Sequence, residues 1–210
     1  MCDTHINKKL TNSLSTQDNM VDALCDACEH FYNTPAHTIQ ELQTRNTKLK
    51  GDIFEYFCLR YMHICYGLER VWLYNDVPET VRVHLHLGKR DMGIDLIGKD
   101  ASDEYYAIQA KYRKRSHRKC SLPWKQLSTF YALACKTGPF KQHIVFTTAD
   151  YIRHNGIKTE KDIAICYRHL QTIDHFKWIE LASFKNAPNV TRLNVEEVRT
   201  KRIEHFLAKK

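Results

Sequence analysis

The sequence of 210 residues lacks two kinds of apolar segment. No apolar run approaches the roughly 18 residues that a membrane-spanning helix needs. Residues 1–15, MCDTHINKKLTNSLS, contain no hydrophobic stretch of the kind found in secretory signals. We therefore expect an intracellular protein, in the cytoplasm or with the nucleoid or nucleus, and not a secreted one. In that reducing environment most of the eight cysteines should remain thiols.

Repeats and paired metal-binding motifs are also missing. No internal repeat, heptad pattern or low-complexity segment occurs, which argues against solenoids and long coiled coils. There is a single CxxC pair, Cys25 and Cys28, whereas structural zinc sites commonly use two. Cys28 falls on the apolar side of a predicted helix, so buried thiols explain the pair better than zinc. His84 and His86 would share a face only in a strand; we predict a helix there and assign no ligand.

The composition is that of a basic globular protein. Hydrophobic residues make up 43% of the chain and aromatic residues 11%, as in folded domains. Lys and Arg number 32 against 24 Asp and Glu, a formal net charge of +8. This excess favours a polyanionic partner, first a nucleic acid and second an anionic membrane, and composition alone does not choose between them.

Hydrophobic periodicity and turn residues divide the chain into four parts. We expect a flexible N-terminus at 1–17, a helical extension at 18–46, a core domain at 47–184 and an amphipathic C-terminal helix within 185–210. Strands are predicted at 70–75, 92–98, 105–112, 142–148 and 162–168, and helices at 18–32, 47–67, 76–88, 123–139 and 174–184. Alternation of helices and strands with one hairpin predicts a three-layer α/β domain.

The predicted hairpin GIDLIGKDASDEYYAIQAKYRKR, residues 93–115, places polar side chains inside apolar runs. Asp95 lies between Ile94 and Leu96, while Gln109 and Lys111 share one face of the second strand. Polar side chains in apolar strands are costly unless they are paired or functional. A suitable register would bring the acid, the amide and the ammonium to one spot.

This pattern resembles the PD-(D/E)xK nuclease superfamily, whose signature is an Asp on one strand followed by an acid or Gln, any residue, and Lys on the next. Ile94-Asp95 and Gln109-Ala110-Lys111 match it, with Ile94 in place of the usual Pro. The Gln and the GID sequence look most like the Mrr-type restriction-endonuclease branch, similar to nuclease domains found next to helicases. The resemblance covers about 47–150, and more weakly extends to about 181. It implies a restriction-endonuclease-like fold with a central mixed β-sheet flanked by helices.

The resemblance also implies a catalytic set and a metal. Glu55, in KGDIFEYF at the edge of a helical apolar arc, matches the Glu that these nucleases often carry on the first core helix. Hard divalent cations prefer oxygen ligands, so Mg²⁺ or Mn²⁺ would be held by Glu55, Asp95, Gln109 and the backbone carbonyl of Ala110. Lys111 would orient or deprotonate the attacking water. Because Gln109 is neutral, we expect weaker metal affinity than in an all-carboxylate site, and a single tightly held Mg²⁺ or Mn²⁺ rather than two.

Further candidates follow the predicted catalytic Lys. The segment YRKRSHRKC is well placed to contact DNA phosphates through Arg113, Lys114, Arg115, Arg118 and Lys119. Gln126 loosely matches a Gln-x-x-x-Tyr element of RecB-type relatives, although Phe130 stands at the Tyr position; a polar residue in a first helical turn explains it equally well. Thr147 and Thr148 could contact phosphates or cap the strand.

Three functions remain open from the sequence. The first is a metal-dependent DNA endonuclease acting on duplex DNA, alone, as a homodimer or with a helicase partner, and without a membrane partner. The second is a catalytically weak or inactive nucleic-acid-binding module on the same scaffold, with Gln109 as its weak point. The third is an unrelated basic adaptor that binds protein or membrane. A lone D…QxK pattern also arises by chance on a solvated hairpin.

Overall fold

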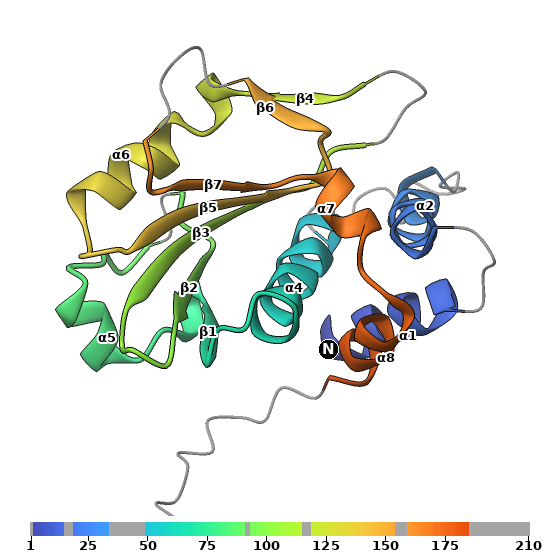
Figure 1. Ribbon diagram of the computed structural model, residues 1–210, viewed down its shortest axis with the longest axis horizontal. Helices are drawn as coiled ribbons and strands as arrows, with labels where there is room; N and C mark the ends of the chain where they lie inside the picture. Colours follow the sequence, from blue (N-terminus) through green and yellow to red (C-terminus); the bar gives the residue numbers. More distant parts are fainter. Residues whose placement is uncertain are drawn as a thin grey trace, which may run out of the picture.

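A computed structural model describes residues 2–14, 19–33, 49–90, 93–114, 119–153 and 159–184. A five-stranded sheet in the order β1-β2-β3-β5-β7 forms its centre (Figure 1). Its strands are β1 (Arg70–Leu73), β2 (Leu96–Lys99), β3 (Tyr105–Lys111), β5 (Gln142–Thr147) and β7 (Asp162–Ile165). The sheet is mixed, because β1, β2 and β3 pair antiparallel whereas β3, β5 and β7 pair parallel.

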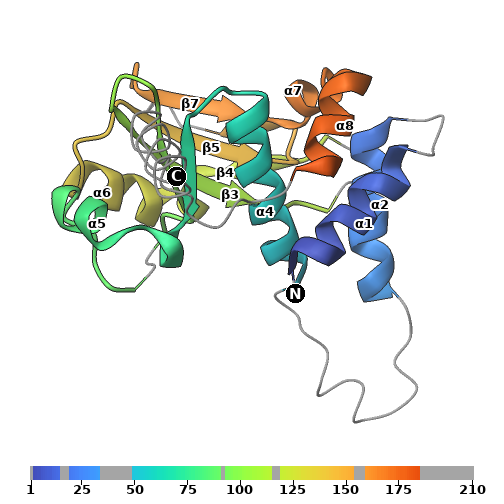
Figure 2. The same ribbon diagram turned by 90° about the horizontal axis from the view of Figure 1, so that it is seen from below.

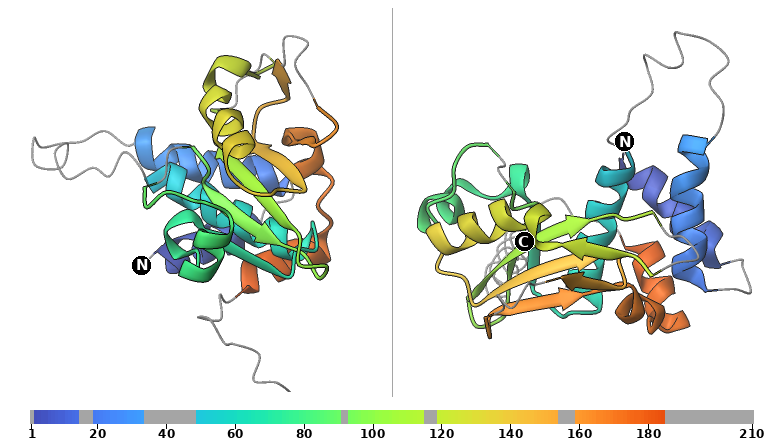
Figure 3. Two further views of the ribbon diagram at one scale, coloured as in Figure 1. Left: turned by 90° about the vertical axis from the view of Figure 1, so that its left-hand side faces the viewer. Right: turned by 90° about the horizontal axis from the view of Figure 1, so that it is seen from above.

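Helices lie on both faces of this sheet. The described helices are α1 (Cys2–Leu14), α2 (Met20–Asn33), α4 (Leu49–Ile64), α5 (Glu79–His84), α6 (Ser128–Lys136), α7 (Tyr167–Gln171) and α8 (His175–Ser183), with 3₁₀ turns η1 (Tyr74–Asp76) and η2 (Trp124–Gln126). Seen from below, α4 covers one face of the sheet. Helices α1, α2, α7 and α8 gather on the side of α4 that is away from β2 and β3 (Figure 2). Seen from above, α6 lies on the other face (Figure 3). The expected three-layer α/β fold with a mixed central sheet is confirmed.

Strand alternation divides the buried side chains into two cores. On β3, Tyr106, Ile108 and Ala110 pack in a cluster with α4. Ala107 belongs to the second cluster, which includes Phe130 of α6. Both faces of β3 are therefore covered, as in a central strand, and a polar side chain on either face must find a partner.

Several predicted elements are confirmed, and three points need correction. The strands at β1, β3 and β5 and the helix at α5 are where the sequence predicts them. The strand predicted at 162–168 ends at Ile165, because Cys166 is the N-cap of α7 and its backbone N–H donates to His169 Nδ1 at 3.0 Å. A short parallel sheet of β4 (Ser121–Pro123) and β6 (Tyr151–Arg153) was not predicted. The C-terminal helix predicted within 185–210 lies outside the described residues.

The third correction concerns the N-terminus. Residues 1–17 were expected to be flexible, yet Cys2–Leu14 form a helix in which Leu10 is fully buried. The Arg60 guanidinium of α4 donates to the carbonyl of Leu181 at 2.9 Å and to Asn7 Oδ1 at 2.5 Å, and the Trp178 indole donates to the carbonyl of Leu10 at 3.3 Å. Contacts with distant segments thus stabilise a helix whose own sequence shows little apolar periodicity.

The cysteine pair on α2 behaves as the core interpretation predicts. Cys25 and Cys28 both lie in the cluster around α4. Burial raises the pKa of the Cys28 thiol to about 11, so that thiol stays protonated and unreactive near neutral pH. Among the described residues no group of three or more His, Cys, Asp and Glu side chains is arranged to hold a metal. In the same part of the chain, no helix has the length and hydropathy required to cross a bilayer.

Candidate active site

The sheet places Asp95 directly before β2, next to the middle of β3. Leu96 pairs with Ile108, and the Asp95 N–H donates to the Ile108 carbonyl at 3.0 Å. On the other side, the Asp95 carbonyl accepts from the N–H of Tyr74, directly after β1, at 2.8 Å. Hydrogen bonds to Ile108 on one side and Tyr74 on the other therefore hold the Asp95 backbone at the end of the antiparallel part of the sheet.

The structure brings the Asp95 and Gln109 side chains into contact. The Gln109 amide nitrogen donates to Asp95 Oδ2, and the Ala110 N–H donates to the same oxygen at 2.8 Å. Asp95 is 9% exposed and Gln109 2% exposed. Two donors directed at one carboxylate oxygen offset part of the cost of burying its charge. Ala110 contributes its N–H here, and a role for its carbonyl oxygen stays a proposal.

Glu55 lies on α4, the helix that covers the Ile108 and Ala110 face. It is half-buried. Burial, and then the negative charges of Asp95 and Glu55, raise the pKa of the Cys58 thiol well above its usual value. Both carboxylates therefore act electrostatically on one fully buried thiol of α4. No sequence signal singled out Cys58 in this position.

Lys111 follows Gln109 by two residues on β3 and shares its face, opposite the face that packs on α4. Its side chain is half-buried and makes no ion pair within the described part of the chain. Asp95 and Gln109 are therefore joined directly, and Lys111 lies at the adjoining position on the strand, whereas Glu55 comes from α4, which covers the other face of β3. A half-buried ammonium with no anion favours a negatively charged ligand.

Thr147 and Thr148 hold this end of β3 in place. The Thr147 hydroxyl donates to the Lys111 carbonyl at 2.7 Å. The Thr148 hydroxyl donates to the Arg113 carbonyl at 2.8 Å and accepts from the Arg113 N–H at 2.7 Å. Both threonines are almost fully buried, so the phosphate-contact alternative is wrong for them. They extend the pairing of β3 with β5 through Arg113 and so position the basic segment.

The basic segment is described only in part. Arg113 is half-buried, and Lys114 and Lys119 are exposed. Arg115 and Arg118 lie outside the described residues. The exposed Gln126 ends η2, and no contact in the described ranges joins it to Asp95 or Gln109. The structure therefore does not bring Gln126 to the site.

Gly93 fixes the approach of the chain to Asp95. Its φ is +132°, and a Cβ there would lie 3.3 Å from the backbone nitrogen of Phe130 and 3.4 Å from Thr129 Cγ2. Gly93→Ala should therefore lower the free energy of unfolding by about 1–3 kcal/mol, because alanine is strained at this positive φ and its Cβ would be crowded by Thr129 and Phe130. Thermal denaturation measures the effect.

Gly51→Ala is the matched control for that substitution. Gly51 lies in α4 with nothing within 4 Å of its Cβ position. Alanine should there raise the free energy of unfolding by about 0.5–1 kcal/mol. Equal effects of the two substitutions would contradict the role assigned to the Gly93 backbone.

The donor set fits a hard divalent cation. Asp95 and Glu55 offer carboxylate oxygens, and Gln109 carries a carbonyl oxygen on the amide that already contacts Asp95. Rotation of that amide about its last torsion exchanges nitrogen for oxygen without moving the backbone. All of these ligands are oxygens, as Mg²⁺ and Mn²⁺ prefer.

Comparison with known families decides which group of proteins shares this arrangement. A family model for restriction endonucleases matches residues 64–187, more than half of the chain. The chain belongs to the restriction endonuclease family. This confirms the resemblance to Mrr-type PD-(D/E)xK nucleases, a group that usually uses divalent metals. The match includes Asp95, Gln109 and Lys111, whereas Glu55 precedes it.

One solved structure is similar to most of this restriction endonuclease family member. The DNA-bound ATP-dependent Type ISP restriction-modification enzyme LlaBIII aligns with 88% of the chain at 20% sequence identity and a TM-score of 0.48. The aligned part covers 11% of LlaBIII, so the chain spans only a small part of that protein's length. No curated protein matches the sequence.

Proposed function

We propose that this member of the restriction endonuclease family is a metal-dependent endonuclease that hydrolyses phosphodiester bonds in duplex DNA. The observation that carries the proposal is the buried Asp95 carboxylate joined to Gln109 beside a half-buried Lys111. Buried polar groups of this kind, inside a sheet covered on both faces, are expected at a working site. The net charge of +8 supports a polyanionic substrate.

Asp95, Glu55 and Gln109 would hold the cation, Mg²⁺ or Mn²⁺. A bound divalent cation supplies Lewis-acid chemistry by neutralising negative charge on the phosphate. The N–H donors of Gln109 and Ala110 at Asp95 Oδ2 would stabilise the carboxylate that holds the cation. Its backbone hydrogen bonds to Ile108 and Tyr74 keep it in place without reorganisation.

Lys111 would act on the attacking water and on the charge that develops at phosphorus. Its ammonium is held on β3, whose end is fixed by Thr147 and Thr148. The Lys111 ammonium can orient a water through a hydrogen bond and stabilise the additional negative charge on the phosphate oxygens. Arg113, Lys114 and Lys119 would hold the flanking backbone without recognising bases.

One observation favours the second function, a catalytically inactive DNA-binding module. The Gln109 amide directs its nitrogen, not its oxygen, at Asp95. In that orientation the amide occupies a lone pair of the carboxylate that a cation would use. The same residues would then bind DNA without cleaving it, and the two functions differ in their dependence on metal.

A plasmid assay separates the two. With Mg²⁺ or Mn²⁺ the protein should convert supercoiled plasmid to open-circular or linear DNA, and EDTA should abolish the conversion. In EDTA it should still shift a DNA duplex on a gel, and the shift should weaken steeply as salt is added. Binding without cleavage in either metal would favour the binding module, and neither binding nor cleavage would exclude both functions.

A further inference from the structure

A polar cluster from three segments lies beside the end of β3. Glu29 of α2 forms ion pairs through its two carboxylate oxygens, Oε1 with Lys50 Nζ at 3.2 Å and Oε2 with Lys114 Nζ at 3.9 Å. Lys50 belongs to the first turn of α4, and Lys114 follows the predicted catalytic Lys111 by three residues. One carboxylate therefore bridges two cations that come from different elements at the edge of the site.

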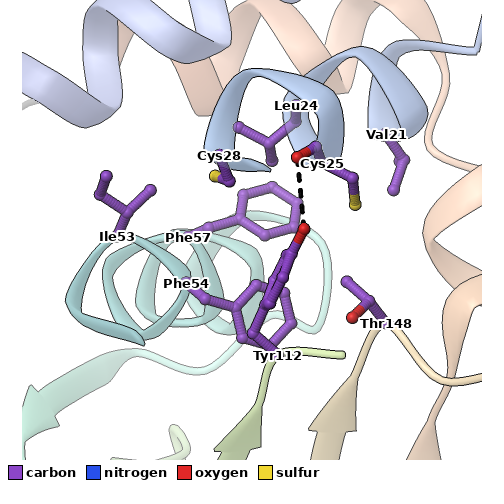
Figure 4. Close-up of a pocket in the computed structure, with 9 residues that line it drawn as sticks. All are labelled: Val21, Leu24, Cys25, Cys28, Ile53, Phe54, Phe57, Tyr112 and Thr148. Carbon is purple, nitrogen blue, oxygen red and sulfur yellow. Dashed lines mark hydrogen bonds between the residues drawn. The ribbon is translucent and has the colours of Figure 1, made fainter. Parts of the chain in front are cut away.

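Tyr112 fixes α2 at this position. Its hydroxyl donates to the Cys25 carbonyl at 3.2 Å, and its ring meets Phe54 edge-on at 5.6 Å between centroids (Figure 4). Lys50 Nζ lies 5.2 Å from the centroid of the same ring. Because Tyr112 directly follows Lys111, the α2 helix is tied to the strand end that carries the candidate catalytic residue.

The ion pairs of this cluster join one carboxylate, Glu29, to two cations, Lys50 and Lys114. Arg113 directly precedes Lys114 in the chain. Arg113 Nε is buried and has no hydrogen-bond partner among the described residues. A buried donor without an acceptor is unfavourable, so the segment retains capacity for an additional anion. The Glu29 side chain is 13% exposed, whereas that of Lys114 is 65% exposed and accessible to solvent.

We propose that Lys50, Arg113 and Lys114 form a subsite for a backbone phosphate of DNA, and that Glu29 occupies it as an internal anion until the phosphate displaces it. The inference rests on the proposed DNA function and adds Lys50 and Glu29 to the residues that meet the substrate. A phosphate offers more oxygens than the carboxylate, and it can accept from Arg113 as well as from the two lysines. The exposed Lys114 pair at 3.9 Å is weak and easily exchanged.

Glu29→Gln tests the displacement. The variant keeps the shape of the side chain and removes the competing charge, so affinity for a labelled DNA duplex in EDTA should rise about 3–10-fold, and the salt dependence should become steeper by about one phosphate contact. Fluorescence anisotropy across a salt series measures both quantities, and a thermal melt checks the fold.

Glu180→Gln is the matched control. Glu180 pairs with Lys177 at 3.2 Å on α8, so this variant changes the net charge equally at another place. A greater gain for Glu29→Gln than for Glu180→Gln supports the subsite, and an equal or smaller gain overturns it. Should Glu29→Gln fail to fold, Lys114→Gln should weaken binding about 3–10-fold relative to the exposed Lys136→Gln, and equal binding of these two would overturn the subsite.

A failure of the DNA function itself gives a different pattern. In that case none of the variants, nor the original protein, binds the duplex at any salt concentration. Elution from heparin then decides the subsite alone. Elution of Glu29→Gln at higher salt than Glu180→Gln supports a polyanion site closed by Glu29, and identical elution overturns it.

Discussion

Lys111→Ala should lower the rate of plasmid cleavage by about 10²–10⁴-fold, because it removes a group proposed to act only as the reaction proceeds. The Lys111 side chain makes no ion pair in the described part of the chain, so its loss should leave the fold intact. DNA affinity in EDTA should fall by less than about tenfold, since one phosphate contact at most is lost. Initial rates on supercoiled, linear and single-stranded DNA measure the first effect, and anisotropy measures the second.

Two further variants sharpen that result. Lys136→Ala removes an exposed cation of α6 and should leave cleavage unchanged. Lys111→Arg keeps the charge but cannot give up a proton near neutral pH, so a rate close to that of Lys111→Ala would assign proton transfer to Lys111. Cleavage retained in Lys111→Ala would end the proposed mechanism, whatever the other variants do.

Asp95→Asn should abolish metal binding and lower cleavage by about 10³-fold or more. In the original protein the Ala110 N–H and the Gln109 amide both donate to Asp95 Oδ2. The asparagine oxygen can still accept from both donors, so the hydrogen bonds of the hairpin survive. What the substitution removes is the anion that a hard cation requires. The change should therefore be seen in metal affinity first and in stability hardly at all.

Calorimetric titration with Mn²⁺ measures that affinity independently of activity. The original protein should bind one ion per chain, and Asp95→Asn none. Asp76→Asn, at an exposed position of η1, is the control and should bind as the original does. Two tightly bound ions per original chain would contradict the single-ion hypothesis, and an unchanged affinity in Asp95→Asn would remove Asp95 from the site.

The candidate site divides into a part that local pattern could predict and a part that it could not. Asp95 and Gln109 stood out because a polar side chain inside an apolar strand is costly, and strand alternation together with a hairpin register brings them face to face. The same alternation put Lys111 beside them. Gln126 had only a loose resemblance to support it, and the structure leaves it exposed on η2.

Thr147 and Thr148 show where local pattern leaves two outcomes open. At the end of a central strand a hydroxyl can contact a ligand or the chain itself, and the residue type is the same in both cases. The parallel pairing of β5 with β3 decides the outcome, because it places both hydroxyls against the backbone of Lys111 and Arg113. They then serve the site by holding its strand.

The sequence by itself determined the α/β class and the hairpin of β2 and β3, and it singled out the three polar residues of the candidate site. These follow from periodicities of two and 3.6 residues and from the cost of burying polar groups, which are local properties of the chain. Only the tertiary structure decided that Cys2–Leu14 is a helix, that Tyr112 of the β3 end contacts the Cys25 carbonyl of α2, and that Glu29 meets Lys50 and Lys114. Such contacts join residues far apart in sequence, and they form because packing of the whole chain, not local preference, selects them.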